Sequence, residues 1–112
     1  MGYGVTNFES GPQLGGLLRT GIPEFRLPAD VLDREIDRIL QLGVNTQTNH
    51  RIDRQELLQM SSNYDAVLVA TGLQEVRSLR LGVGNHDGVW QGIEFLEQLA
   101  LFGVIQVVDR RL

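Results

Sequence analysis

The chain has 112 residues, of which 42% are hydrophobic and 21% charged, values that fit one small globular domain and exclude a disordered polymer. It contains no cysteine and no lysine, which excludes disulfides, thiol nucleophiles, iron–sulfur ligands and a Schiff-base lysine within these residues. The net charge of −4 argues against a general nucleic-acid-binding surface. The longest apolar run, residues 66–70, is too short to cross a membrane, and the first residues lack a signal-peptide pattern. We therefore expect a cytoplasmic protein with neither a membrane span nor a nucleic-acid partner.

The first predicted element is a strand over residues 5–8, which ends at Glu9 just ahead of the turn-forming Ser10-Gly11-Pro12. Glycines and prolines then recur throughout residues 11–28, and this stretch shows neither helical nor strand periodicity. Loops of this length are uncommon in small domains unless they have a function. Because the stretch also carries large apolar residues, we predict a long loop that packs against something.

A helix over residues 29–42 is the clearest pattern, since apolar residues recur at helical spacing, Asp30 lies near its start and Gly43 follows it. Asp33 and Asp37 share this helix with neighbouring arginines, a charge pattern typical of a solvated helix face.

The remaining elements alternate between strands and helices. The run at 66–70 is uniformly apolar, so we expect that strand to be covered on both faces, as in a parallel sheet. Such alternation predicts an α/β fold with mostly parallel pairing. In chain order these elements are a strand at 44–48, a helix at 53–60, the strand at 66–70, a helix at 91–102 and a strand at 104–108.

Two features suggest a ligand. Glu9 ends a strand, where α/β folds place the carboxylate that binds ribose hydroxyls, although a solvated glutamate would also fit this position. Gly15-Gly16 lets the backbone approach a ligand closely, although an ordinary flexible turn has the same composition. Arg19 and Arg26 can each pair with an anionic group.

His50 and His86 lack metal-ligand spacing, so we expect turn or surface histidines and no metal site. We also expect no catalytic residue.

Six segments share their order with one family. They are VTNFE, GGLLRTGIPEFRLP, DVLDREI, LGV, YDAVLVATG and GVWQGIEFLEQ. In this order they resemble the FAD- and NAD(P)H-binding oxidoreductases typified by the small subunit of glutamate synthase, and the flavin region of dihydropyrimidine dehydrogenase is similar. The resemblance covers roughly residues 2–99.

The resemblance implies an FAD site. Glu9 matches the carboxylate that binds the adenosine ribose, Arg26 matches an arginine that contacts the cofactor, and main chain at Ile52 meets the adenine. The other residues implied to line the cofactor are Gly15, Gly16, Leu17, Thr71 and Gly72. NAD(P)H and iron–sulfur clusters would bind outside these 112 residues.

The family's two GxGxxG fingerprints are not found in the sequence. The first would precede VTNFE and the second would follow Leu112; Gly2-Tyr3-Gly4 and Gly82-Val83-Gly84 lack the required context. We therefore expect one partial Rossmann-like FAD-binding domain, with a doubly wound, mostly parallel sheet that lacks its first strand and helix. Its parts would be a strand and cofactor-lining loop (1–28), a helix-strand-helix-strand unit (29–72), and a connector, helix and strand (73–112) leading to an absent NAD(P)-binding domain.

The expected function is that of a flavoprotein segment that positions FAD while electrons pass from NAD(P)H through the flavin. Its expected partner is the rest of the oxidoreductase chain or a catalytic subunit. The 112 residues alone are expected to be inactive, to bind FAD weakly or not at all, and to self-associate through unpaired strand edges. The alternative is a non-catalytic α/β module that serves in interaction or structure without a cofactor.

Overall fold

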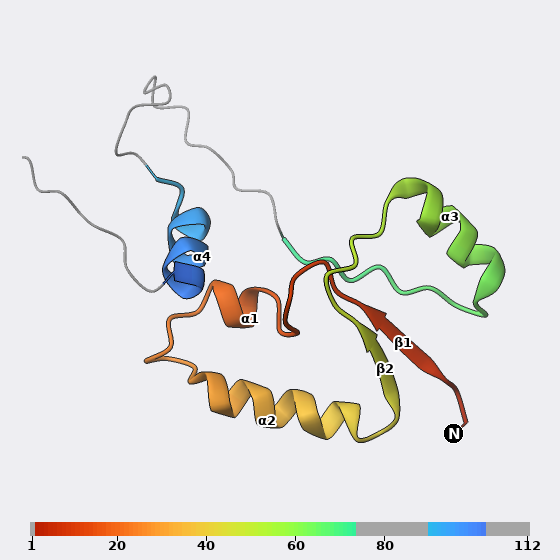
Figure 1. Ribbon diagram of the computed structural model, residues 1–112, viewed down its shortest axis with the longest axis horizontal. Helices are drawn as coiled ribbons and strands as arrows, with labels where there is room; N and C mark the ends of the chain where they lie inside the picture. The colour runs from red at the N-terminus through yellow and green to blue at the C-terminus, as the bar shows by residue number, and fades with distance from the viewer. Residues whose placement is uncertain (1, 74–89, 103–112) are drawn as a thin grey trace, which may run out of the picture.

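The computed structural model describes residues 2–73 and 90–102 of the chain. It contains a two-stranded parallel sheet and helices, so the α/β prediction is confirmed for this part. Figure 1 shows α1 between α2 and α4, and α3 projecting away from them beyond the strands. The elements are β1 (Val5–Phe8), α1 (Leu17–Thr20), α2 (Ala29–Leu40), β2 (Val44–Gln47), α3 (Arg54–Asn63) and α4 (Gly92–Phe102).

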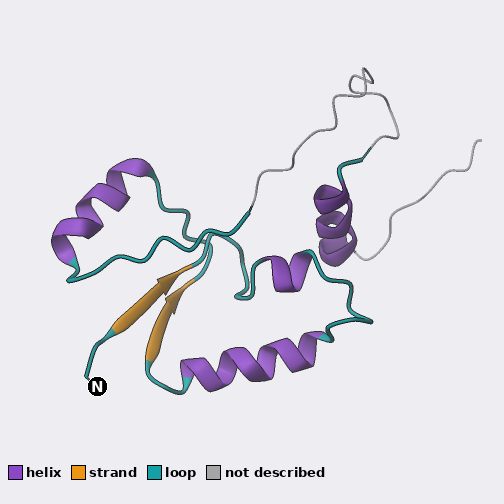
Figure 2. Cartoon of the chain, turned by 180° about the vertical axis from the view of Figure 1, so that it is seen from behind, coloured by secondary structure: helices purple, strands orange, loops and turns teal. Residues whose placement is uncertain are grey.

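The two strands pair in parallel from Val5 opposite Val44 to Phe8 opposite Gln47. A parallel pair needs a crossover between its strands, and α1 and α2 lie on that crossover. Hydrogen bonds continue past the last paired residues, since Glu9 N donates to Gln47 O at 2.9 Å and His50 N donates to Glu9 O at 2.9 Å. The loops that follow the two strands therefore run side by side (Figure 2).

Local signals explain both longer helices of the first 73 residues. Pro28 precedes α2, and its carbonyl accepts hydrogen bonds from the backbone N–H groups of Val31 and Leu32. Asp53 caps α3, because its side chain accepts a hydrogen bond from Glu56 N at 2.8 Å. The predicted helices at 29–42, 53–60 and 91–102 are confirmed, with no end shifted by more than three residues.

Two sequence predictions were wrong. Residues 66–70 form no strand and are all exposed, because no other described strand pairs with their backbone. The predicted loop at 11–28 contains the short helix α1, which starts at the two glycines. The predicted strand at 104–108 and nearly all of the connector at 73–90 lie outside the described residues.

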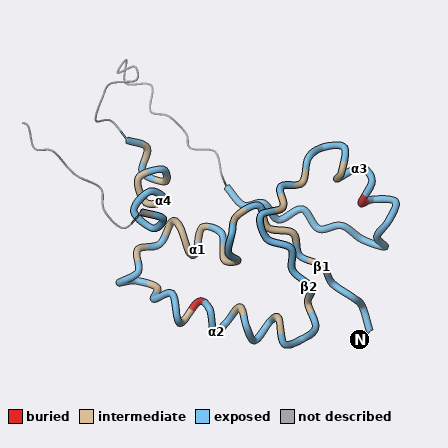
Figure 3. The backbone as a smooth tube through the Cα atoms, in the orientation of Figure 1, coloured by how far each residue is buried: buried red, intermediate tan, exposed pale blue. Residues whose placement is uncertain are grey.

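Few side chains are buried in the described part of the chain. Only Leu32 on α2 and Met60 on α3 are buried there (Figure 3). Large apolar side chains such as Phe25, Leu42 and Leu68 are more than four-fifths exposed. No helix of the described residues has the length and apolar character needed to cross a bilayer. The described elements thus present apolar surface that they do not themselves cover.

Leu32→Ala is expected to lower the free energy of unfolding by about 2 kcal/mol, because it removes a buried side chain and leaves a cavity against the glycine turn. Ile39→Ala on the same helix is the matched control, since Ile39 is 56% exposed and should cost less than about 0.5 kcal/mol. Urea unfolding of both variants measures the difference. Equal midpoints would show that Leu32 is not a core residue.

Candidate functional site

At the carboxyl edge of the sheet, the backbone of Glu9 is joined to that of His50, two residues before Ile52. The backbone bond from His50 N to Glu9 O and the bond from Asn49 N to Gly11 O at 2.8 Å join the two loops there. Asn49 adopts a left-handed conformation (φ 54°), a geometry that asparagine tolerates better than most residues. Main-chain hydrogen bonds therefore fix the relative position of these two predicted site segments.

Glu9 directly follows β1 and is half-buried. Its Oε1 accepts a hydrogen bond from Gly11 N at 2.7 Å and a longer one from Ser10 Oγ at 3.4 Å. Among the described residues, none donates to Oε2. One carboxylate oxygen is thus held by its own loop, and the other can accept hydrogen bonds from a ligand hydroxyl.

The two glycines of the turn have different surroundings. Gly15 has φ +120°, and a Cβ placed there would lie 3.0 Å from Cδ2 of Leu32. Gly16 has φ +49°, and a Cβ there would meet nothing within 4 Å. Gly15 is therefore required for close packing of the turn on α2. Of these two glycines, Gly16 is the one that faces open space, in which a ligand could approach the backbone.

Arg19 fastens this turn to α2, a role that its sequence position alone did not reveal. Its Nε donates to Leu14 O at 2.7 Å and its Nη2 donates to Asp33 Oδ1 at 2.5 Å. The Arg19 side chain is 18% exposed, whereas that of Asp33 is 56% exposed. The solvated-face interpretation of Asp33 was thus incomplete, because Asp33 also reaches a residue outside its own helix.

His50 links the edge to the start of α3. His50 Nε2 lies 2.7 Å from Glu56 Oε1, and the His50 ring meets Phe8 edge-on at a centroid distance of 5.2 Å. Both side chains are 35% exposed, and Asp53 caps the helix nearby. These contacts restrain the short segment that contains Ile52. The predicted turn or surface histidine is therefore a half-buried residue with a defined partner.

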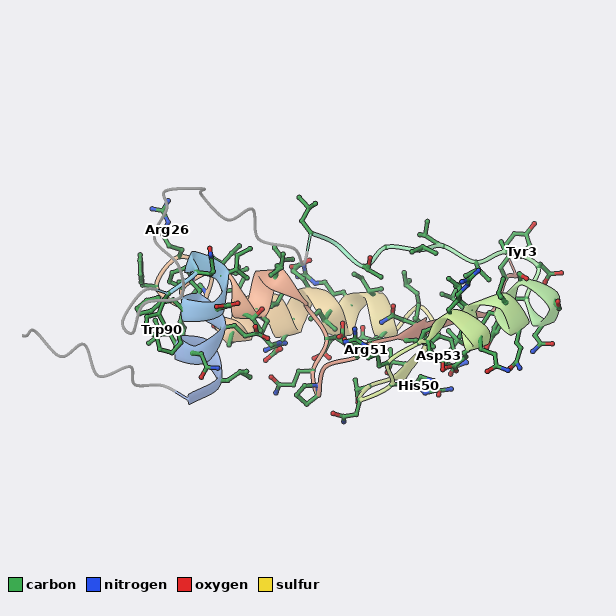
Figure 4. All side chains as sticks on the ribbon, turned by 90° about the horizontal axis from the view of Figure 1, so that it is seen from above. Tyr3, Arg26, His50, Arg51, Asp53 and Trp90 are labelled. Atoms are coloured by element: carbon green, nitrogen blue, oxygen red, sulfur yellow. The ribbon has the colours of Figure 1, made fainter. Side chains whose placement is uncertain are left out.

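Other predicted site residues lie elsewhere. Arg26 is exposed and lies toward the end of the molecule near α4 and Trp90, away from His50, Arg51 and Asp53 (Figure 4). Thr71 and Gly72 belong to the exposed irregular segment after α3. Leu17 begins α1 directly after the glycine turn. The structure thus joins the backbone of Glu9 to that of His50, two residues before Ile52, and does not bring Arg26 to this place (Figure 4).

The residues at this edge partly fit a dinucleotide. A carboxylate with one oxygen that accepts no hydrogen bond from the described residues suits ribose hydroxyls. The open side of Gly16 admits a polar or anionic group close to the backbone. The nearby backbone N–H groups of Gly11, Asn49 and His50 already donate hydrogen bonds within the loops. The edge can therefore bind and orient a ligand, and none of these contacts activates a nucleophile or moves a proton.

Comparison with known proteins found relatives among oxidoreductase subunits. The chain is 44% identical over 105 residues to the NADP(+)-dependent formate dehydrogenase subunit beta of Moorella thermoacetica, covering 89% of the chain and 15% of that protein. It is 49% identical over 74 residues to the NAD-dependent dihydropyrimidine dehydrogenase subunit PreT of Salmonella typhimurium (65% of the chain, 18% of PreT). It is 35% identical over 103 residues to the glutamate synthase [NADPH] small chain of Escherichia coli (86% of the chain, 21% of the relative).

The chain therefore spans about a fifth or less of the length of these three relatives. No family model matches it, and no solved structure matches it. The identities of 35–49% nevertheless confirm the resemblance that the ordered motifs predicted.

Gly15→Ala is expected to lower the free energy of unfolding by about 2–3 kcal/mol, because the new Cβ adds a clash with Leu32 to the strained φ. Gly16→Ala meets open space and should cost only the backbone strain, about 1–2 kcal/mol. Adding Leu32→Ala to each variant separates the two terms. The losses of unfolding free energy from Gly15→Ala and Leu32→Ala should then add to more than the loss in their double variant, whereas those from Gly16→Ala and Leu32→Ala should be additive. Additive losses in both double variants would contradict the packing role of Gly15.

Proposed function

Because the chain belongs to the oxidoreductase family that includes PreT and the glutamate synthase small chain, we propose that it forms part of an FAD-binding domain and positions that cofactor. The observation that carries this proposal is the half-buried Glu9, whose Oε2 accepts no hydrogen bond from the described residues and whose backbone carbonyl accepts one from His50 N. In α/β folds, a carboxylate at this strand end is suited to the hydroxyls of a nucleotide ribose.

Each part of the edge would have its own role. Glu9 would accept hydrogen bonds from the adenosine ribose hydroxyls, and the main chain at Ile52 would meet the adenine. The open side of Gly16, together with Leu17, would line the cofactor where it passes the start of α1. The predicted contacts of Thr71 and Gly72 belong to the same proposal.

Arg26 fits this proposal in a different way. FAD is a long molecule, and Arg26 lies away from the His50 end of the described chain (Figure 4). Arg26 would therefore contact a part of the cofactor remote from the adenosine ribose. Its exposed guanidinium is suited to a planar or anionic group.

The bound flavin would supply the redox chemistry, by accepting hydride from NAD(P)H and passing electrons onward. The residues described above would bind and orient the cofactor without acting as acid, base or nucleophile.

Further polypeptide is the proposed partner. Within the described residues only two side chains are buried, while Leu42, Leu68 and Leu73 are more than four-fifths exposed. We propose that the remainder of an oxidoreductase chain or a partner subunit covers this apolar surface. The alternative of a cofactor-free interaction module is not favoured, since the three relatives above are all subunits of oxidoreductases.

The direct test is a flavin titration of the natural polypeptide that carries this segment, followed by flavin fluorescence and absorbance. Tight binding with a shifted flavin spectrum is expected, whereas the 112 residues alone should bind FAD much more weakly. A natural polypeptide that purifies without flavin and does not bind added FAD would contradict the proposal.

Glu9→Gln is expected to weaken FAD binding by about tenfold, because the neutral amide keeps one oxygen acceptor but loses the charge-assisted hydrogen bonds. Glu35→Gln is the matched control, since Glu35 is an exposed glutamate on α2 whose partner is Arg38, and it should leave affinity unchanged. Isothermal titration with FAD measures both. Equal affinities for the two variants would remove Glu9 from the cofactor site.

A further inference from the structure

The guanidinium of Arg19 makes two hydrogen bonds that lead to different parts of the chain. Nε donates to the carbonyl of Leu14, the residue just before the two glycines, and Nη2 donates to Asp33 on α2. The side chain is 18% exposed, so water competes for these bonds less than it does at the surface. One side chain thereby ties the start of the glycine turn to the neighbouring helix.

A second contact restrains the same turn from the same stretch of α2. Leu32, adjacent to Asp33, places its Cδ2 3.0 Å from the position of a Cβ on Gly15. Cβ and Nε of Arg19 lie 3.4 Å and 3.5 Å from the same position. Gly15 is therefore in close contact with an apolar and a charged side chain, whereas the corresponding Cβ position at Gly16 is open.

The other ion pairs of α2 differ from this one. Arg34 and Asp30 lie 3.4 Å apart, Arg38 and Glu35 lie 2.5 Å apart, and all four side chains are at least 60% exposed. Both pairs join residues of one helix, and such pairs contribute little to stability. The Arg19–Asp33 pair instead joins residues 14 positions apart, one on α1 and one on α2. It is therefore the pair in this set that can control the position of the turn.

We infer that Arg19 is a positioning residue, which holds the Gly15-Gly16 turn through Asp33 and the Leu14 carbonyl so that the open side of Gly16 faces the cofactor. This inference rests on the proposed function, because it assigns Arg19 to the FAD site. A turn that is already ordered loses less conformational freedom when the cofactor binds. Without Arg19, the cofactor itself must order the turn, and affinity falls.

The test compares Arg19→Gln with Arg38→Gln in the natural polypeptide. Arg19→Gln should raise the dissociation constant for FAD about 3- to 10-fold, with turnover at saturating FAD kept within about twofold. Hydrogen exchange at the amides of Leu18 and Thr20 should accelerate by a similar factor. Arg38→Gln also removes an arginine from an ion pair, but that pair does not touch the turn, so both readouts should stay at the wild-type value.

Two further variants separate positioning from a general loss of stability. Arg19→Lys keeps the charge opposite Asp33 but cannot reproduce the planar fork, so it should restore part of the affinity. The double variant Arg19→Gln/Asp33→Asn should bind FAD with the same affinity as Arg19→Gln alone, because the contact between the two residues is already lost in the single variant. If Arg19→Gln does not fold, Asp33→Asn supplies the same comparison against Asp30→Asn.

The outcomes distinguish this inference from the proposed function. If the wild-type protein binds no FAD, the proposed function fails, and the assignment of Arg19 to the FAD site fails with it. This holds even if hydrogen exchange at Leu18 and Thr20 shows that Arg19 orders the turn. If the wild type binds FAD but Arg19→Gln matches Arg38→Gln in both affinity and exchange, the positioning role is overturned while the proposed function stands. A change in thermal stability without a change in FAD affinity would also overturn it.

Discussion

The parallel pairing of β1 with β2 is the constraint on which the rest of the site depends. Parallel strands end at the same edge, and here the backbone bonds among Gln47, Glu9 and His50 continue the pairing beyond that edge. This pairing holds the backbone of Glu9 beside His50, two residues before Ile52. The side-chain contacts around them, from Glu56 to His50 and from Phe8 to His50, then restrain a geometry that the backbone has already set.

Much of this arrangement could be predicted from the sequence. Apolar spacing located α2, and the position of Glu9 at a strand end followed from the short β-prone run before it. The helix α1 was missed because four residues between glycines are too few to show a period. Residues 66–70 have a strand-like composition, but a strand also needs a neighbour for its backbone, which composition does not report. Likewise, the charge pattern of α2 could not tell that Asp33, unlike Asp30, contacts a distant arginine.

The glycine turn shows why two adjacent glycines need not share a role. Gly15 is enclosed by Leu32 and Arg19, so its small size serves packing within the fold. Gly16 borders open space, so its small size can serve a ligand. In the proposed function the packing glycine and the Arg19 contacts hold the ligand-facing glycine in place. The exposed apolar surface around these elements, and the small share of its relatives that the chain spans, are consistent with further polypeptide completing the site.

The most direct measurement is a crystal structure of the natural polypeptide with FAD bound. The proposed role of this segment requires Oε2 of Glu9 to lie within about 3.2 Å of a ribose hydroxyl, with the cofactor passing the open side of Gly16. A structure in which FAD lies away from the carboxyl edge of β1 and β2, with Glu9 bonded only to its own loop, would contradict it.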